Sequence, residues 1–428
     1  MNELTKLIKE DMKPALGVTE PGAIAFAAAT AREHLAGDAE KLEMTLNSGM
    51  YKNAYTCGIP GSTLLGNEYA AALGVIMADP SKGLLCLEGL SDEDQSKADE
   101  MVRQGRVHVN MCEVTSRIYI EAKASNKDHS SRVIIRDSHT NIVEIKEDDV
   151  VVLREKESTA DTDGSEHNSP LIHKYTLRDL YEYVCAVPAE EIEFISEAFR
   201  MNMELFEEGL ENERTTFSKA LLDSNGGKVF SDDPQSTASL LCNTAIEARV
   251  IGLGRPAMSI TGSGAHGIIA TLPLYAYAKV CGVSNELLLR ATALSYLICM
   301  YIKEYSGKLS AFCGCAIAAG TGMACGLVLM KGGSTGDMGR TINNMASSIT
   351  GMICDGGNHG CTMKGIVAVD AAFRSVDFAM KGICIESVHG INGRTPEETM
   401  RNMGMIASPG MTGTEKTIVE LLQDKSCK

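Results

Sequence analysis

Five cysteines in the second half of the sequence lie in glycine-rich surroundings, where thiols can bind metal or take part in reactions. They are Cys313, Cys315 and Cys325 in AFCGCAIAAGTGMACG (311–326), and Cys354 and Cys361 in GMICDGGNHGC (351–361). Cys thiolates bind iron–sulfur clusters, and glycine lets backbone N–H groups approach the sulfur atoms. The absence of a C-x-x-C pair argues against a zinc ribbon. Cys is also among the most often buried residue types, so simple packing between close helices is the competing interpretation.

A second candidate is the small-residue loop TGSGAHG within SITGSGAHGIIATLP (259–273), which opens a predicted helix. The free N–H groups at such a helix start suit a carboxylate or phosphate, so Ser263 and Gly264 are candidate binding residues. His266 at the same turn is a candidate general acid or base. The loop lacks the G-K-[S/T] ending of a P-loop. The alternative is an ordinary tight turn that carries a solvated histidine.

Two further loops carry polar residues next to predicted strands. Lys52 and Asn53 follow a strand in the Gly/Pro-rich stretch 47–62, where a loop lysine can face a substrate carboxylate. An exposed connection with no such role is the other interpretation. His139 and Asn141 lie between two predicted strands, although a histidine in a turn is usually only solvated.

Charge and composition limit the class of protein. The 428 residues include 56 acidic and 40 basic side chains, giving a formal net charge of −16. This argues against nucleic acid or an anionic membrane as a partner, because both need clustered Lys and Arg. The uncharged run 311–330 is Gly/Ala-rich and is expected to form a buried helix and not a membrane span. The N-terminus lacks an apolar signal region, so we expect a cytoplasmic protein whose 14 cysteines are reduced.

The hydrophobic pattern predicts an α+β fold. Alternating apolar residues predict an N-terminal α+β part with a mostly antiparallel sheet, and apolar segments of helical length predict an all-helical C-terminal part. We expect N-terminal helices at 1–40 that pack on the helical domain, an α+β domain at 41–175, and a helical domain at 176–428 that carries the site. Helices are expected at 309–331 and 338–353, and a polar loop at 157–170.

Six stretches together resemble one family over nearly the whole chain. The chain resembles the L-cysteine desulfidase family, which is similar to the alpha chain of the iron–sulfur L-serine dehydratases. The matching stretches are ALGVTEP (15–21), MYKN (50–53), HTNIV (139–143), TGSGAHGIIATLP (261–273), LSAFCG (309–314) and MICDGGNHGCTMK (352–364).

The resemblance implies a 4Fe–4S cluster and elimination without pyridoxal phosphate, which converts L-cysteine to sulfide, ammonia and pyruvate. Of the family's three cluster cysteines, two correspond to Cys313 and Cys354. The third position is Val18, which cannot ligate iron. Cys361, Cys315 or Cys57 then becomes the third ligand, or the cluster is lost and the substrate differs. Position 266 departs as well, since relatives have Asn-Gln where this chain has Ala-His.

The family mechanism assigns provisional roles to the remaining candidates. Lys52 and the N–H groups of the TGSGAHG loop would hold the substrate carboxylate, and His266, Lys303 or Glu20 would remove the Cα proton. The leading hypothesis is a carbon–sulfur or carbon–oxygen lyase acting on a small amino acid, in a possible homo-oligomer. The alternatives are a serine dehydratase-like deaminase, a cluster-free relative with another small substrate, and a catalytically inactive small-molecule-binding protein.

Overall fold

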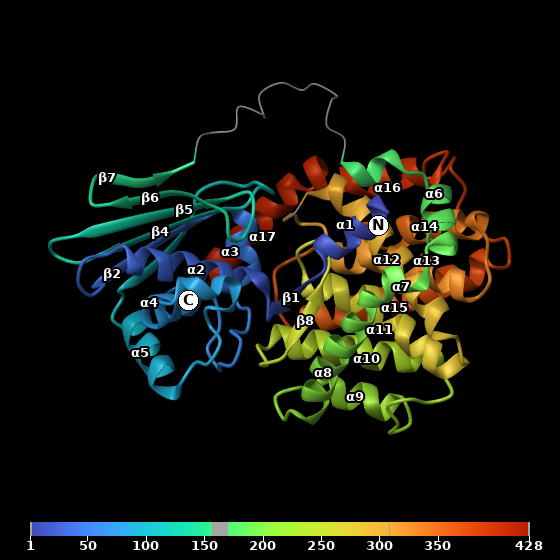
Figure 1. The fold of residues 1–428 in the computed structure, drawn as a ribbon, viewed down its shortest axis with the longest axis horizontal. Helices are drawn as coiled ribbons and strands as arrows, with labels where there is room; N and C mark the ends of the chain where they lie inside the picture. Colours follow the sequence, from blue (N-terminus) through green and yellow to red (C-terminus); the bar gives the residue numbers. More distant parts are fainter. Residues whose placement is uncertain (1, 156–169, 308, 427–428) are drawn as a thin grey trace.

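The computed structural model describes residues 2–155, 170–307 and 309–426. The molecule has two parts, a sheet-containing part and a larger helical part, which lie side by side (Figure 1). This arrangement confirms the predicted α+β class, with a mostly antiparallel sheet followed by helices. The polar loop predicted at 157–170 lies outside the described residues except for its last residue.

The sheet has six strands in the order β3-β2-β4-β5-β6-β7, and only the β2–β3 pair is parallel. Its strands are β2 (Lys41–Leu46), β3 (Val107–Met111), β4 (Tyr119–Ser125), β5 (Ser130–Arg136), β6 (Ile142–Glu147) and β7 (Val150–Arg154). The helical elements of this part are α2 (Thr19–Glu33), α3 (Ser48–Ala54), α4 (Asn67–Met77), η1 (Pro80–Leu85) and α5 (Asp92–Arg103).

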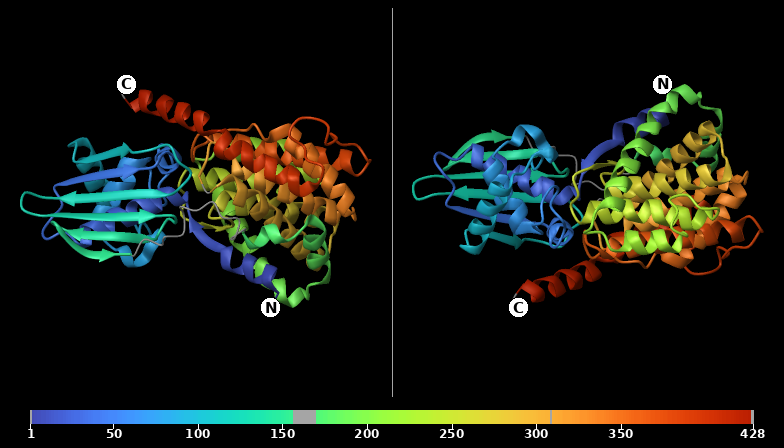
Figure 2. Two further views of the ribbon diagram at one scale, coloured as in Figure 1. Left: turned by 90° about the horizontal axis from the view of Figure 1, so that it is seen from above. Right: turned by 90° about the horizontal axis from the view of Figure 1, so that it is seen from below.

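Helices cover one face of the sheet, and the alternation along β4 explains which face. In β4 the side chains of Ile120, Ala122 and Ala124 are buried, and this strand packs against α2. The intervening residues Glu121 and Lys123 point to the opposite face, which Figure 2 shows without a covering helix. A period of two therefore places the apolar residues on the covered side.

The helical part is built from long helices rich in small residues. Its helices are α6 (Leu177–Ala186), α7 (Ala189–Ile192), α8 (Ser196–Glu211), α9 (Phe217–Ser224), α10 (Pro234–Val250), α11 (Gly264–Cys281), α12 (Asn285–Ser306), α13 (Gly320–Met330), α14 (Thr335–Ile349), α15 (Gly360–Ala379), α16 (Pro396–Met405) and α17 (Thr412–Ser426), with shorter turns η2 (Leu171–Lys174), η3 (Glu193–Ile195), η4 (Cys315–Ala319) and η5 (Ile406–Gly410). α12 and α13 approach so closely that a Cβ at Gly322 would lie 2.2 Å from the carbonyl oxygen of Ser295. Of the helices described, none combines the length and apolar character needed to cross a membrane.

Two short strands that the sequence pattern does not predict join the chain start to the helical part. β1 (Lys13–Leu16) pairs antiparallel with β8 (Pro256–Ser259), so the second half is not entirely helical. Helix α1 (Glu3–Asp11) contacts α12, whereas α2 lies on the sheet. The first forty residues are thus divided between the two parts of the molecule.

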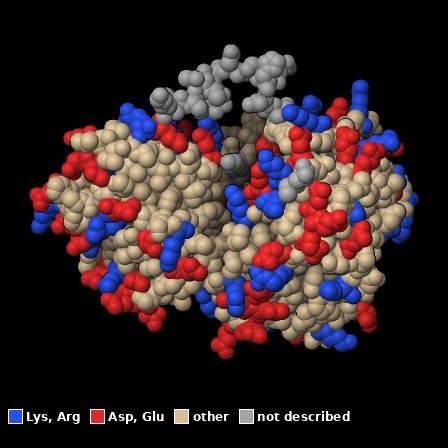
Figure 3. Space-filling view, viewed as in Figure 1, with Lys and Arg blue, Asp and Glu red and all other residues tan. Residues whose placement is uncertain are grey.

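The helices expected at 309–331 and 338–353 are shorter than predicted. Residues 309–313 and 350–359 form non-helical segments, which are linked by an antiparallel bridge between Phe312 and Ile353. Glycines at the ends of these apolar runs favour irregular backbone over continued helix. Figure 3 shows a hollow in the surface where the two parts meet, and acidic and basic side chains are interspersed on this face.

Candidate functional site

Five segments that are distant in sequence meet near the boundary between the two parts. They are the start of α2, helix α3, the TGSGAHG loop, and the non-helical segments 309–313 and 350–359. The Thr19 hydroxyl donates to the Gly262 carbonyl at 3.4 Å, which joins the first of these segments to the loop. Asn53 of α3 donates to a Glu20 carboxylate oxygen at 2.9 Å, and its side-chain oxygen lies 3.9 Å from Cys354 Sγ.

The backbone brings Cys313 and Cys354 to neighbouring positions. Cys313 N–H donates to the Met352 carbonyl at 3.0 Å, and Cys354 N–H donates to the Ala311 carbonyl at 2.6 Å, on either side of the 312–353 bridge. Cys361, in the first turn of α15, lies within electrostatic range of Cys354 and Cys313. The structure therefore places Cys313, Cys354 and Cys361, three of the candidate thiols, in one region of the molecule.

All three thiols are held in the protonated form. A hydrogen bond between Cys313 and Cys315, followed by burial, raises the pKa of Cys313 well above its usual value. Burial raises the pKa of Cys354, and burial together with Cys354 raises the pKa of Cys361 to about 12. The nearby Lys364, which is ion-paired with Asp355, lowers these values only in part.

The thiols do not fit a 4Fe–4S cluster at the three positions that the resemblance implies. Among residues 2–155, 170–307 and 309–426, no group of three His, Cys, Asp or Glu side chains is close enough to hold a metal ion together. Val18 fills the remaining position: it is 3% exposed, and its methyl groups would lie 3.0–3.1 Å from a Cβ at Gly357.

Lys52 is not available to bind a substrate, which corrects the role predicted for it. It lies on α3 and not in a loop, and its ammonium donates to the carbonyls of Ser310 and Cys354 at 3.0 and 2.9 Å and to Glu415 Oε2 at 2.7 Å. An ammonium has three donors, so this set of acceptors uses all of them. Lys52 instead fixes both thiol-bearing segments to the C-terminal helix α17.

His266 and Lys303 are buried together inside the site. A Cβ at Gly314 would lie 2.8 Å from His266 Nε2 and 3.2 Å from Lys303 Cδ, so both side chains flank this glycine. Burial, with the charges of Lys303 and Arg249, lowers the pKa of His266 to about 3, so its imidazole is neutral. Burial also lowers the pKa of Lys303, whose amine donates to the Gly307 carbonyl at 2.8 Å.

The hydrogen bonds of His266 indicate which of its nitrogens carries the proton. Thr261 donates its hydroxyl to the Ile260 carbonyl at 2.7 Å, so its oxygen accepts from His266 Nδ1. Nε2 is then the unprotonated nitrogen, and it lies beside Gly314. Thr261 has φ = 51°, a strained value for a non-glycine residue.

His139 and Asn141 lie in the turn between β5 and β6. The Asn141 amide donates to the Arg136 carbonyl at 3.3 Å and so closes its own turn. Both side chains are partly buried, and their contact with a substrate stays a prediction. Glu20, by contrast, is 6% exposed and lies at the start of α2 within the site.

Sequence reasoning missed Arg249, which lies in the last turn of α10 and is 5% exposed. A Cβ at Gly264 would lie 2.7 Å from Arg249 Nε, so the side chain lies against the TGSGAHG loop. The sequence offered only a charged residue in the last turn of a predicted helix, which is a common feature of helices.

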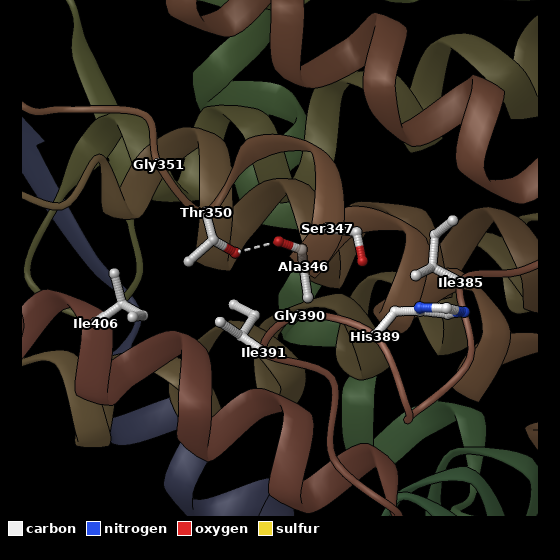
Figure 4. A pocket seen from close by; sticks show the side chains of 9 residues that line it. All are labelled: Ala346, Ser347, Thr350, Gly351, Ile385, His389, Gly390, Ile391 and Ile406. Atoms are coloured by element: carbon white, nitrogen blue, oxygen red, sulfur yellow. Dashed lines mark hydrogen bonds between the residues drawn. The ribbon is translucent and has the colours of Figure 1, made fainter.

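A pocket of about 420 Å³ opens on the helical part, and Thr350 and Gly351 at the start of the segment 350–359 contribute to its lining (Figure 4). It lies between the end of α14, the loop that carries His389, and the turn at Ile406. None of the predicted site residues lines it.

Known protein families and individual proteins match this chain over most of its length. A sequence model of the serine dehydratase alpha chain matches residues 81–420. A UPF0597 protein of Clostridium botulinum (strain Langeland / NCTC 10281 / Type F) is 42% identical over 429 residues, which cover 99% of each chain. UPF0597 proteins of Clostridium tetani and Clostridioides difficile are 34% and 33% identical, over 99% and 98% of this chain and 98% and 99% of theirs.

Proposed function

Since the chain belongs to the serine dehydratase alpha chain family, we propose that it is a lyase that eliminates the β-substituent of a small amino acid without pyridoxal phosphate. Membership of this family supports a dehydratase or lyase-type role. L-Cysteine is the first substrate that we propose, because the sequence stretches of the site resemble those of the L-cysteine desulfidases.

The observation that carries this proposal is the pairing of Lys303 with His266 in a buried site. A lysine general base needs a neutral amine, and burial lowers the pKa of Lys303 toward that state. His266 is neutral, and its unprotonated Nε2 lies beside the same glycine. Lys303 is therefore the proposed base, and His266 Nε2 accepts a hydrogen bond from the substrate amino group.

The chemistry that we assign to these residues is a β-elimination. The Lys303 amine takes the Cα proton, the electron pair of that C–H bond forms the Cα–Cβ double bond, and the Cβ–S bond breaks. The sulfur leaves as hydrosulfide, and the proton taken by Lys303 later returns to solvent. The released aminoacrylate is hydrolysed to pyruvate and ammonia, so all atoms are accounted for.

The family resemblance also implies a 4Fe–4S cluster, which Cys313, Cys354 and Cys361 do not fit, because no three such side chains among the described residues could hold a metal ion together. Its presence is tested independently of the reaction, by measuring iron and acid-labile sulfide per chain after anaerobic purification. A bound cluster would give about four irons per chain.

The function is tested by product analysis on the anaerobically purified protein. Incubation with L-cysteine is expected to release sulfide, ammonia and pyruvate in equal amounts. L-Serine, assayed in parallel, gives pyruvate and ammonia alone if the enzyme is a deaminase of the serine dehydratase type. The proposal is wrong if neither amino acid yields a keto acid, whereas ligand-dependent thermal stabilisation without turnover would indicate a binding protein.

A further inference from the structure

Arg249 is a buried cation without a partner. Its side chain is 5% exposed, its Nε forms no hydrogen bond, and it makes no ion pair with any residue that the structure describes. Arginine is almost never buried in this way unless it is paired, because removing an unpaired charge from water is unfavourable. A site that keeps such a guanidinium is prepared for an anion.

The guanidinium lies against the start of α11, which is the second positive feature here. A Cβ at Gly264 would lie 2.7 Å from Arg249 Nε and 3.3 Å from its Cδ. The Ser263 side chain does not cap this helix, and the N–H groups of Gly264, Ala265 and His266 have no acceptor within the described residues. Unpaired N–H groups at a helix start carry partial positive charge and bind anions.

The neighbouring acidic groups do not supply the missing anion. Burial raises the pKa of Cys57, so this thiol is neutral although it lies within electrostatic range of Arg249. Glu20 accepts from the Asn53 amide and Asp11 accepts from the Thr261 N–H, and neither carboxylate forms an ion pair with Arg249. The described part of the chain therefore supplies no counter-ion to Arg249, which leaves this position open to an anion from outside.

We propose that Arg249 and the free N–H groups at the start of α11 bind the carboxylate of the small amino-acid substrate. The identity of this anion rests on the proposed function. A guanidinium binds a carboxylate through two parallel hydrogen bonds, and the helix start adds further donors. His266 lies in the first turn of the same helix and Lys303 lies beside it, so a carboxylate held here places its Cα on their side.

The proposed site recognises the α-carboxylate of the substrate and not its β-substituent. The carboxylate site replaces the role that the sequence analysis gave to Lys52, whose donors are all used by the protein. Compounds with a free α-carboxylate bind regardless of their β-substituent, and amines that lack it do not. Selectivity between sulfur and oxygen leaving groups then comes from the opposite side of the site.

Binding to the whole protein tests this inference with L-alanine, which has no leaving group, and ethylamine, which lacks the carboxylate. Calorimetry is expected to show binding of L-alanine only. Arg249→Gln is expected to weaken it by about 10- to 100-fold, the range for a charged hydrogen-bonded pair. The matched control is Arg214→Gln, which removes an arginine that donates to the Ile251 carbonyl at 2.6 Å, just after the same helix, and leaves the L-alanine affinity unchanged.

A second variant keeps the test valid if Arg249→Gln fails to fold. Gly264→Ala retains the arginine residue but puts a methyl group 2.7 Å from Arg249 Nε. The methyl group is expected to push the guanidinium aside and so to weaken L-alanine binding. Unchanged affinity in the folded variants, or equal binding of ethylamine, would overturn the inference. Turnover of L-cysteine with an unchanged KM in Arg249→Gln would reject the carboxylate site alone. Arg249-dependent binding of L-alanine without any lyase activity would reject the proposed function alone.

Discussion

Two regions of this molecule bury a positive charge, and they do so in opposite ways. Where α3 meets α17, the Lys52 side chain is 0% exposed and has three acceptors, one of them the carboxylate of Glu415. At the start of α11, Arg249 is nearly as buried but has no partner among the described residues. The charge of Lys52 is thus balanced within the chain, whereas the charge of Arg249 is the one for which we propose a ligand as the partner.

The two buried charges differ in role, since Lys52 positions segments of the site and Arg249 is proposed to bind the substrate. Lys52 ties the carbonyls of Ser310 and Cys354 to the C-terminal helix, so its charge holds two segments of the site in place. Around α11 the positive charges of Arg249 and Lys303 face a neutral His266 and protonated thiols. This excess of positive charge is what lowers the pKa of His266 after burial, and it is suited to a substrate that carries a carboxylate.

In the region around α11, replacement of Lys303 is expected to give the largest effect, a loss of kcat. Lys303→Met removes the proposed base, and general-base catalysis contributes about 10²- to 10⁴-fold, so kcat is expected to fall by at least that range. In the parent enzyme kcat rises with pH as the Lys303 amine loses its proton, at a pKa below the usual value for lysine. Initial rates of pyruvate formation across pH measure both effects.

The matched control for this variant is Lys331→Met at the end of α13, where the lysine pairs with Asp377 on the surface. It is expected to keep the parental kcat and the same dependence on pH. Retention of substantial activity in Lys303→Met would mean that His266 or Glu20 is the general base.

The free energy of unfolding is expected to depend strongly on Lys52 and only weakly on Arg249. Lys52→Met leaves Glu415 buried without its counter-charge, which is expected to lower the free energy of unfolding by about 3–5 kcal/mol. Arg249→Met breaks no pair within the chain, so it is expected to change that energy by less than about 1 kcal/mol or to raise it. Urea unfolding, followed by circular dichroism and compared at equal m-values, measures the difference.

The double variant Lys52→Met/Glu415→Leu is the internal control, because an apolar pair of similar size can replace a buried ion pair. Recovery of most of the lost stability is expected. Equal losses for Lys52→Met and Arg249→Met would remove the distinction between the two regions.

Local patterns in the sequence predicted the elements that depend on local interactions. Alternating apolar residues, as in KLEMTL, predicted the strands of the sheet, and a capping box between Ser91 and Asp94 begins α5. The β1–β8 pair was not predicted, since four residues in each strand give too little alternation to recognise. MYKN was read as a loop because Gly and Pro follow it, yet it lies in α3.

The charged residues of the site show what sequence alone cannot supply. Lys52 was assigned to the substrate because its partner, Glu415, lies 363 residues away, and no local pattern links the two. Arg249 could not be recognised for the opposite reason, since its significance is the lack of a partner, which requires knowledge of all its neighbours. The thiols were identified as a set because the resemblance, and not their spacing alone, connects them.

The smallest expected effect uses pH to measure the excess positive charge around α11. The pKa of His266 is lowered to about 3 in the folded protein, whereas an unfolded histidine has a pKa near 6.5. Below pH 6.5 the unfolded chain therefore binds a proton that the folded chain does not, so stability falls as the pH falls toward 3. Between pH 7 and pH 5 this one group is expected to reduce the free energy of unfolding by about 2 kcal/mol.

Comparison with His266→Gln isolates this contribution, since every other titrating group is present in both proteins. Urea unfolding at pH 7 and pH 5 is expected to show a loss about 2 kcal/mol smaller in the variant than in the parent. A bound carboxylate partly neutralises Arg249, so L-alanine should raise the pKa of His266 and reduce the difference further. The same loss in both proteins would mean that His266 is protonated in the folded state, and that an anion of the protein itself already compensates the charge around α11.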